Sequence, residues 1–232
     1  MRLSLSRITY FLVGIAIFLA FSSLSINIFS KLTGHGRIFG LIDLLSLDVE
    51  RNIPTTFSVF LLAASSMLLA IIASIKYLEE DKFTRYWICL SIGLAFMAID
   101  ENVSLHERLV EPTREILRES LGMEKLGILH FAWVVPVMII VCFIGLFFIK
   151  FIVELPKETR RSFLLVAAIY LIGAIGMELI GGYIAESQSQ QVISYSLVTT
   201  IEESCEMLGV ILFIRALLKY ISDNYGGIKL LS

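Results

Sequence analysis

Residues 126–149 read LGILHFAWVVPVMIIVCFIGLFFI, a run of 24 residues without Asp, Glu, Lys or Arg. A helix rises 1.5 Å per residue, so about 20 apolar residues cross the roughly 30 Å of membrane hydrocarbon. Hydrocarbon offers no hydrogen bonds to the backbone, so a spanning segment must be a helix or belong to a closed barrel. The run therefore predicts a transmembrane helix.

Five further runs of low charge predict five more spans. The third uncharged run, residues 86–99, is too short to cross alone, so its helix is expected to continue into residues 100–105. The six predicted spans are residues 8–30, 54–75, 84–105, 126–149, 162–185 and 192–214. The sequence predicts one all-α polytopic membrane helical bundle over residues 1–232, with short interfacial helices at about 38–47 and 113–121.

The composition excludes two broad classes of function. The chain is 57% hydrophobic and 17% charged, with a mean hydropathy of +0.83. A water-soluble fold of this size could not bury that much apolar surface. Its 19 basic and 21 acidic residues form no basic cluster, which argues against nucleic acid as a partner. Cys89, Cys142 and Cys205 lie inside predicted spans without CxxC spacing, as expected for packing residues.

The basic residues predict an orientation. With the N-terminus inside, the inner segments hold 12 Lys and Arg and the outer segments hold 7. Cytoplasmic loops carry the excess of basic residues. The bias predicts that both termini are cytoplasmic.

Acidic side chains lie inside or at the ends of three predicted spans, where charged groups are costly and mark candidate functional sites. Because successive spans alternate in direction, all of these side chains are expected at one level, in the outer half of the membrane for the predicted orientation. We call this group the carboxylate layer; it is expected to consist of Asp100, Glu101, Glu107, Glu178, Glu202, Glu203 and Glu206. An inverted topology would move the layer to the other side without dispersing it.

The carboxylate layer is expected to hold either protons or a metal ion. No Lys or Arg lies inside the spans at that depth, and neighbouring buried carboxylates cannot all stay ionised without a cation. Carboxylates with imidazoles suit a divalent ion such as zinc, iron or manganese. The predicted metal ligands are Asp100, Glu101, His106, His130, Glu178, Glu202 and Glu206.

Helical spacing refines these roles. Glu202 and Glu206 share a helix face at i,i+4, and a continuous helix would also put Asp100 and Glu107 on one face at i,i+7. Glu203 and Glu107 are the predicted general bases. Glu107 also reads as part of a solvated surface helix, and His130 as a packing residue near the interface.

Three classes of function follow. The first is a metal-dependent membrane enzyme, such as a hydrolase, that acts on a lipid-like or amphiphilic substrate entering from the bilayer. The second is a divalent-cation or proton-coupled transporter, and the third is an accessory membrane subunit. An enzyme predicts a one-sided site with a lateral opening to lipid, and a transporter predicts polar residues reaching the other face. An accessory subunit predicts carboxylates that face lipid. Neither the substrate nor the oligomeric state follows from the sequence.

Two strings carry a resemblance. ERNIPT at residues 50–55 and DENVSLHE at residues 100–107 resemble strings in a group of bacterial multi-span inner-membrane proteins of uncharacterised activity. The resemblance implies a location in the bacterial inner membrane and brings no activity with it.

Overall fold

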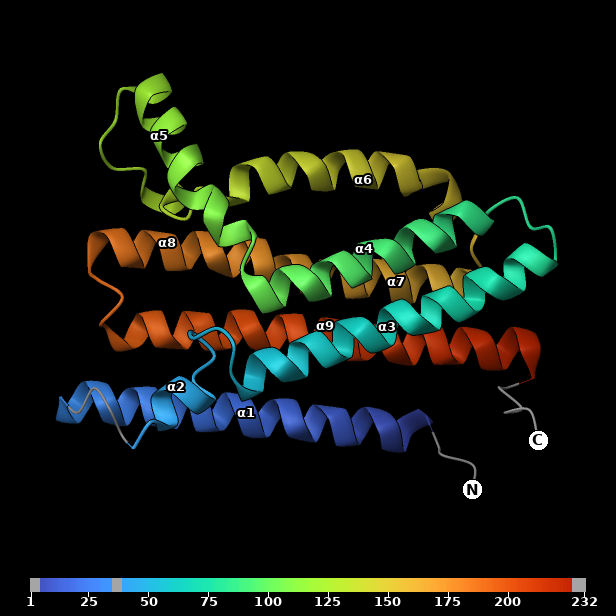
Figure 1. Ribbon diagram of the computed structural model, residues 1–232, viewed down its shortest axis with the longest axis horizontal. Coiled ribbons are helices and arrows are strands. Elements are labelled where there is room, and N and C mark those ends of the chain that lie inside the picture. Colours follow the sequence, from blue (N-terminus) through green and yellow to red (C-terminus); the bar gives the residue numbers. More distant parts are fainter. Residues whose placement is uncertain (1–4, 35–38, 227–232) are drawn as a thin grey trace.

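The structure is a computed structural model that describes residues 5–34 and 39–226. Long helices run side by side along one axis, and no strand occurs in these ranges (Figure 1). The long helices are α1 (Leu5–Thr33), α3 (Ile53–Leu78), α4 (Thr84–Val103), α6 (Val134–Glu154), α7 (Lys157–Leu171) continued by η3 and α8, and α9 (Ile193–Tyr225). The expected all-α helical bundle is confirmed.

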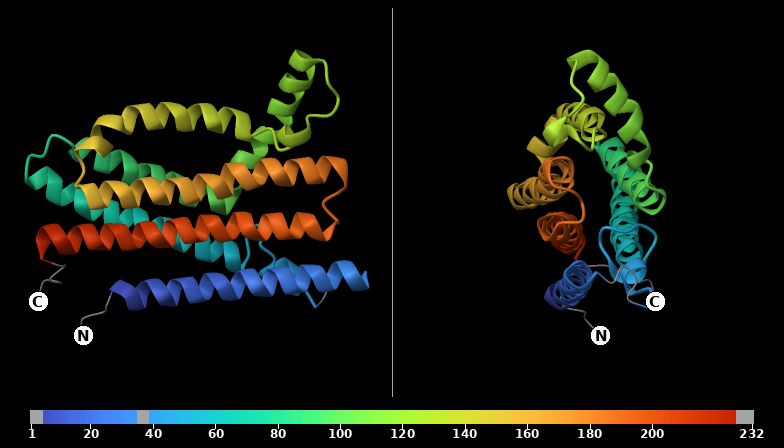
Figure 2. Two further views of the ribbon diagram at one scale, coloured as in Figure 1. Left: turned by 180° about the vertical axis from the view of Figure 1, so that it is seen from behind. Right: turned by 90° about the vertical axis from the view of Figure 1, so that its left-hand side faces the viewer.

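Short elements gather at one end of the bundle, where α1 ends and α9 begins (Figure 1). They are α2 (Leu41–Leu45), η1 (His106–Leu109), α5 (Val110–Leu121) and η2 (Gly127–Leu129). We call this the site end and the opposite one the far end. Helix α1 begins and α9 ends at the far end, as an even number of crossings requires (Figures 1 and 2).

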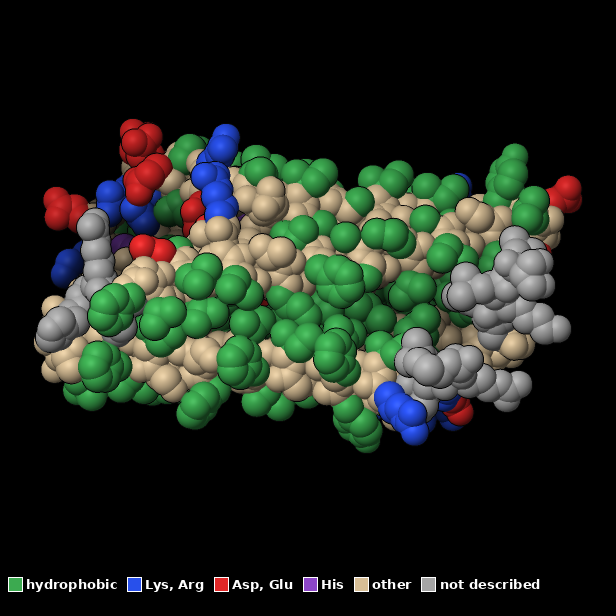
Figure 3. Space-filling model, turned by 60° about the horizontal axis from the view of Figure 1, so that its bottom comes forward, with side chains coloured by type: hydrophobic (Ala, Val, Ile, Leu, Met, Phe, Trp, Pro, Cys, Tyr) green, Lys and Arg blue, Asp and Glu red, His purple; other side chains and the backbone are tan. Residues whose placement is uncertain are grey.

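The flank of the bundle is apolar. Five helical segments are long and apolar enough to cross a membrane: α1, α3, α4, α6 and the rod from Lys157 to Ser187. Helix α9, with 33 residues, is also long enough, but its glutamates and basic residues set it apart in composition. Figure 3 shows hydrophobic side chains over most of one face and charged side chains gathered towards its two ends. This pattern is typical of a multi-pass membrane protein.

Helix α9 is the centre of the packing, because α1, α3, α7 and α8 all lie against it. At the far end an aromatic cluster closes the core, with the Trp87 ring 5.0 Å from Phe151, 6.1 Å from Phe163 and 5.0 Å from Tyr220. Nearer the site end, Leu61 of α3 and Met207 of α9 are almost fully buried. The core from the far end up to the level of Met207 is therefore mainly apolar, with Ser65 buried in it and Ser66 hydrogen-bonded to Ser91 between α3 and α4.

Several predicted boundaries change. Helix α4 ends at Val103 because Ser104 adopts a left-handed conformation with φ 50°. The fourth span begins at Val134 rather than residue 126, since Gly127 has φ 59° and residues 127–129 form a separate 3₁₀ turn. The last helix runs to Tyr225 rather than residue 214, and its Lys219 reaches the Glu158 carboxylate at 2.5 Å at the far end.

Both predicted short helices are present with different bounds. The first shrinks to α2, and residue 38 lies outside the described residues. The second lengthens to α5, which ends at Gly122 with φ 63° and leans away from the bundle axis (Figure 1). Helix α5 carries charged residues such as Glu111 and Arg114. Its position at the membrane interface stays a prediction.

The fifth rod contains a π-helical segment, η3 (Ile172–Met177), between α7 and α8. Here Gly173 lets the rod approach α9 closely. A Cβ added at Gly173 would lie 2.8 Å from the Glu202 carbonyl oxygen and 2.9 Å from the Cys205 Cβ. One added at Gly176 would meet nothing nearer than Ile172 of its own segment, at 3.9 Å.

Gly173→Ala is therefore expected to destabilise the bundle by about 1–3 kcal/mol, because the clash involves backbone that cannot move freely. Gly176→Ala is the matched control, because it makes the same change in the same segment without a clash. Thermal unfolding in detergent compares the two variants. Equal melting temperatures for both would contradict the close approach at Gly173.

Candidate functional site

The structure brings the carboxylate layer together at the site end. Glu202, Glu203 and Glu206 occupy one turn of α9, Glu178 opens α8, and Glu101 lies in the last turn of α4. Each of these five carboxylates lies within electrostatic range of others in the group. Three separate elements therefore supply one cluster, as the alternation of the spans predicted.

Glu178 and Glu202 form a carboxyl–carboxyl pair between α8 and α9, with their side chains hydrogen-bonded to each other. The Trp133 indole, just before α6, also donates to Glu178 Oε1 at 2.7 Å. Glu178 directly follows the π segment, whose extra residue per turn changes the direction in which the next side chains point. Two carboxyl groups in such contact must share a proton or a cation.

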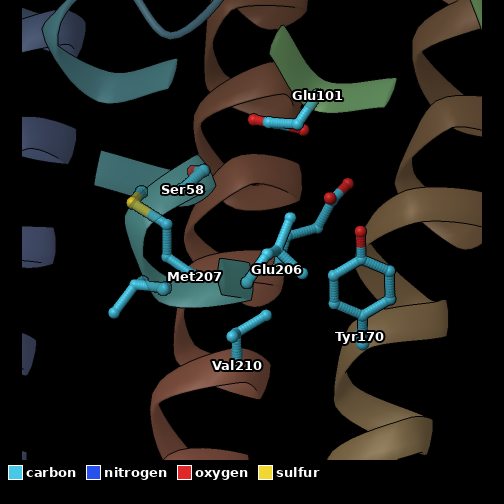
Figure 4. Close-up of a pocket in the computed structure, with 8 residues that line it drawn as sticks. Ser58, Glu101, Tyr170, Glu206, Met207 and Val210 are labelled. Carbon is cyan, nitrogen blue, oxygen red and sulfur yellow. The ribbon is translucent and has the colours of Figure 1, made fainter. Parts of the chain in front are cut away.

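Glu206 faces α7 and α4. Its side chain is hydrogen-bonded to Tyr170, and Glu101 is hydrogen-bonded to Ser58 of α3. Between them lies a small cavity with room for about one water molecule, floored by apolar side chains such as Met207. In Figure 4 the Glu206 carboxylate points towards the Tyr170 hydroxyl, and Glu101 projects into the same space. The close fit of α7 on α9 here depends on Gly209, where an added Cβ would lie 3.2 Å from the Tyr170 Cβ.

His106 joins the site through a turn. Because the helix ends before Ser104, the chain folds back, and Asp100 accepts hydrogen bonds from the His106 backbone amide at 2.9 Å and lies 2.8 Å from His106 Nδ1. The imidazole ring lies 4.8 Å from the Trp133 ring. A carboxylate on Nδ1 orients the ring and leaves Nε2 as the nitrogen available to a ligand. Asp100 and Glu107 do not share a helix face, so that expectation was wrong.

Burial works to lower the pKa of His106. The hydrogen bond between His106 and Asp100 and the negative charges of Asp100, Glu107 and Glu50 outweigh this effect. Together they raise the pKa of His106 above the ordinary 6.5. The charged imidazole is thus favoured in the folded protein. Its contribution to stability is fully present below pH 6.5 and is lost as the pH rises through the raised pKa.

The loop before α3 contributes groups beyond the predicted set. Within residues 5–34 and 39–226, Glu50 Oε2 is a buried side-chain oxygen that accepts no hydrogen bond. Glu50 lies within electrostatic range of Glu101 and His106. Burial raises the pKa of Glu50, and the nearby negative charge of Glu107 raises it further. Glu50 is also adjacent to Arg51, whose positive charge lowers the pKa of Glu50 by less than burial raises it.

A lysine lies at the edge of the layer. Lys31, in the last turn of α1, donates to the carbonyl oxygens of Gln190 and Val192 at 2.9 Å and to Ser196 Oγ at 2.6 Å. Its charge also acts on Asp48, whose carboxylate is hydrogen-bonded to Tyr195 of α9. Lys31 falls one residue beyond the predicted span and contacts the start of α9, so the expectation that the spans themselves hold no Lys or Arg at the depth of the carboxylate layer is unchanged.

Two predicted residues lie apart from the cluster. His130 Nδ1 is 4.0 Å from Glu186 Oε1, and Arg114 donates to the His130 carbonyl oxygen at 2.8 Å and 3.2 Å. Burial and the positive charge of Arg114 lower the pKa of His130. Glu107 is exposed at the rim of the site end. The structure therefore places His130 with Arg114 and Glu186 rather than with the carboxylate layer.

The side chains of the site are of types that bind divalent cations, but they are not arranged around a single ion. No group of three His, Cys, Asp or Glu side chains is arranged to hold a metal ion in the described part of the chain. Paired oxygens occur at Glu178 and Glu202, an unsatisfied oxygen at Glu50 and an oriented imidazole at His106. Oxygen and imidazole donors suit zinc, iron or manganese, and an ion would have to draw these side chains closer together.

The pH titration of His106 tests the turn at Ser104. Asp100→Asn removes the carboxylate charge beside His106 Nδ1. The charged imidazole loses that stabilisation, so the pKa of His106 is expected to fall. Nuclear magnetic resonance of the imidazole protons, in detergent with a chelator, measures this shift. Asp223→Asn, an exposed residue at the far end, is the control. An unchanged titration in Asp100→Asn would contradict the contact.

Comparison with known proteins leaves the activity open. Neither a curated protein nor a solved structure matches the chain. Residues 9–221 match a family described as a domain of unknown function, DUF8692. The match covers every long helix and the whole carboxylate layer. The chain belongs to the DUF8692 family.

Proposed function

We propose that this protein is a metal-dependent membrane enzyme, of the hydrolase type, that acts on a lipid-like or amphiphilic substrate. The observation that carries the proposal is the one-sidedness of the site. Carboxylates from α4, α8 and α9 and the oriented His106 meet at the site end. Below them, Leu61, Met207 and the aromatic cluster around Trp87 close the core.

This closure favours an enzyme over a transmembrane carrier. A carrier needs a path of polar or charged groups that continues to the opposite face. Here the carboxylates are followed mainly by packed apolar side chains, and the serines among them, such as Ser65, bond to nearby backbone or to one another. The accessory-subunit hypothesis predicts carboxylates that face lipid. Instead, Glu178 and Glu202 bond to each other, and Glu206 bonds to Tyr170.

The residues divide into roles under this proposal. Glu178, Glu202 and His106 Nε2 are the first ligands for the ion. A bound divalent ion would activate water and polarise the bond that is attacked. Glu203, on the same turn of α9 and within electrostatic range of Glu206, is the proposed general base. Asp100 holds His106 and is a positioning residue.

Metal content tests the proposal. Protein purified in detergent is expected to carry nearly one equivalent of zinc, iron or manganese by mass spectrometry. Glu178→Gln and Glu202→Gln should each lose most of it, because a neutral amide is a poor ligand for a divalent cation. Glu154→Gln is the matched control, since Glu154 ends α6 at the far end, 3.9 Å from Lys82. Metal-free wild-type protein would overturn the metal-enzyme proposal.

A proton-coupled carrier is the second candidate, because Glu178 and Glu202 need no metal ion between them if they share a proton. Uptake into vesicles containing the purified protein distinguishes the two. The enzyme proposal expects neither proton nor manganese flux above that of protein-free vesicles. Flux that disappears in Glu202→Gln would establish the carrier instead.

We further propose that the membrane is the bacterial inner membrane and that both termini face the cytoplasm. The bias of basic residues and the two strings at 50–55 and 100–107 support this. The carboxylate layer then lies in the outer half of the membrane. Labelling of an introduced cysteine at Glu119, in α5, tests the orientation. A membrane-impermeant maleimide should reach it in intact cells.

A further inference from the structure

Helix α6 packs on the bundle at its two ends and stands away between them. Val134 is 0% exposed and Phe151 is 1% exposed, and these are the buried residues of the helix. From Met138 to Phe147 every side chain is exposed except the half-buried Val141. A stretch of this length makes almost three turns and presents every face of the helix. No side of its middle is therefore tightly covered.

The same gap is visible from α4. Tyr86 lies 5.0 Å from Phe147 and 5.7 Å from Phe148, so its face of α4 looks towards α6. Gly93 lies seven residues further along the same face, and a Cβ added there would meet nothing within 4 Å. On α6, Ile144 lies one turn before Phe148 and is 50% exposed. The two helices touch near the far end and separate towards the site end.

The two ends of this α4–α6 gap differ in chemistry. The far end is closed by aromatic rings, with Tyr86 5.5 Å from Phe151 and Trp87 5.0 Å from Phe151. The other end lies at Trp133, directly before α6. The Trp133 indole donates to Glu178 Oε1, and its ring lies 4.8 Å from the His106 ring. The gap is therefore an apolar space that ends beside the carboxylate layer.

We propose that the α4–α6 gap binds one acyl chain of a membrane lipid, whose polar end lies beside Trp133. In the membrane, hydrocarbon is the medium that fills a space between apolar helices, and an empty space would forfeit dispersion contacts. The open stretch from Met138 to Phe147 is about 14 Å long, nearly half of the roughly 30 Å of hydrocarbon. One chain of one leaflet fits that length.

The inference deepens the proposed function and rests on it in one respect. It makes an acyl lipid the substrate class, with its tail under α6 and its polar part at the carboxylate layer. Binding of the tail itself depends on the α4–α6 gap and not on metal. The two proposals therefore fail separately.

Filling the gap tests the tail site. Gly93→Leu places a side chain in the open space, and Gly14→Leu in α1 is the matched control, since a Cβ there also meets nothing within 4 Å. Each protein is incubated with vesicles of phosphatidylethanolamine and phosphatidylglycerol, extracted into detergent and examined by native mass spectrometry. Wild type and Gly14→Leu should retain one phospholipid. Gly93→Leu should lower the ratio of bound to free protein about tenfold, at an unchanged melting temperature.

Ile144→Trp fills the gap from the other wall and should have the same effect. Equal retention in Gly93→Leu and wild type would overturn the tail site. So would equal loss in Gly14→Leu, or a second copy of the chain retained in place of lipid. Metal is measured in the same samples. If the protein binds metal but Gly93→Leu retains lipid as the wild type does, the enzyme proposal stands without the tail site. If the wild type lacks metal but Gly93→Leu still loses lipid, the tail site stands without the enzyme proposal.

Discussion

Hydrocarbon does not solvate carboxylates, so the glutamates of α9 must find their partners inside the bundle. Each one turns towards a different neighbour. Glu202 lies against Glu178 of α8, Glu206 lies against Tyr170 of α7, and Glu203 is within electrostatic range of Glu206 and of Glu101 in α4. The place of α9 at the centre of the packing follows from this need, because a helix at the edge would expose the same side chains to lipid.

The partners are reached by bringing backbones unusually close. Gly173 sits against the backbone of α9 at Glu202, and Gly209 sits against Tyr170. Between lipid-embedded helices, small residues at the interface allow such approach. The π segment before Glu178 belongs to the same arrangement, because it reorients the rod just where Glu178 has to face Glu202. Packing and site chemistry are therefore set by the same few residues.

The sequence predicted the helical class, the order of the spans and the convergence of the carboxylates, since each depends on charge and length alone. It did not predict the break at Ser104, because a left-handed serine has no reliable sequence signal. Without that break, His106 points away from Asp100, and with it the two bond. The predicted place of His130 beside the carboxylates differs from the structure for a related reason. Its depth was inferred from a helix beginning at residue 126, whereas a 3₁₀ turn precedes α6. Lys31 and Glu50 lie in segments whose direction follows from tertiary packing.

The central position of α9 also affects how the protein is made. Helix α1 is synthesised before the other described helices, and it packs against α9, the last of them. Membrane helices insert as separate units and then associate. Helix α3 can pack at once on α4, which follows it, whereas α1 must wait in the bilayer until α9 has been synthesised. Glu178 likewise enters the membrane before its partner Glu202 exists. The nascent chain thus passes through a stage in which its most polar membrane residue is unpaired, a stage suited to a chaperone or to rapid delivery of the last helix.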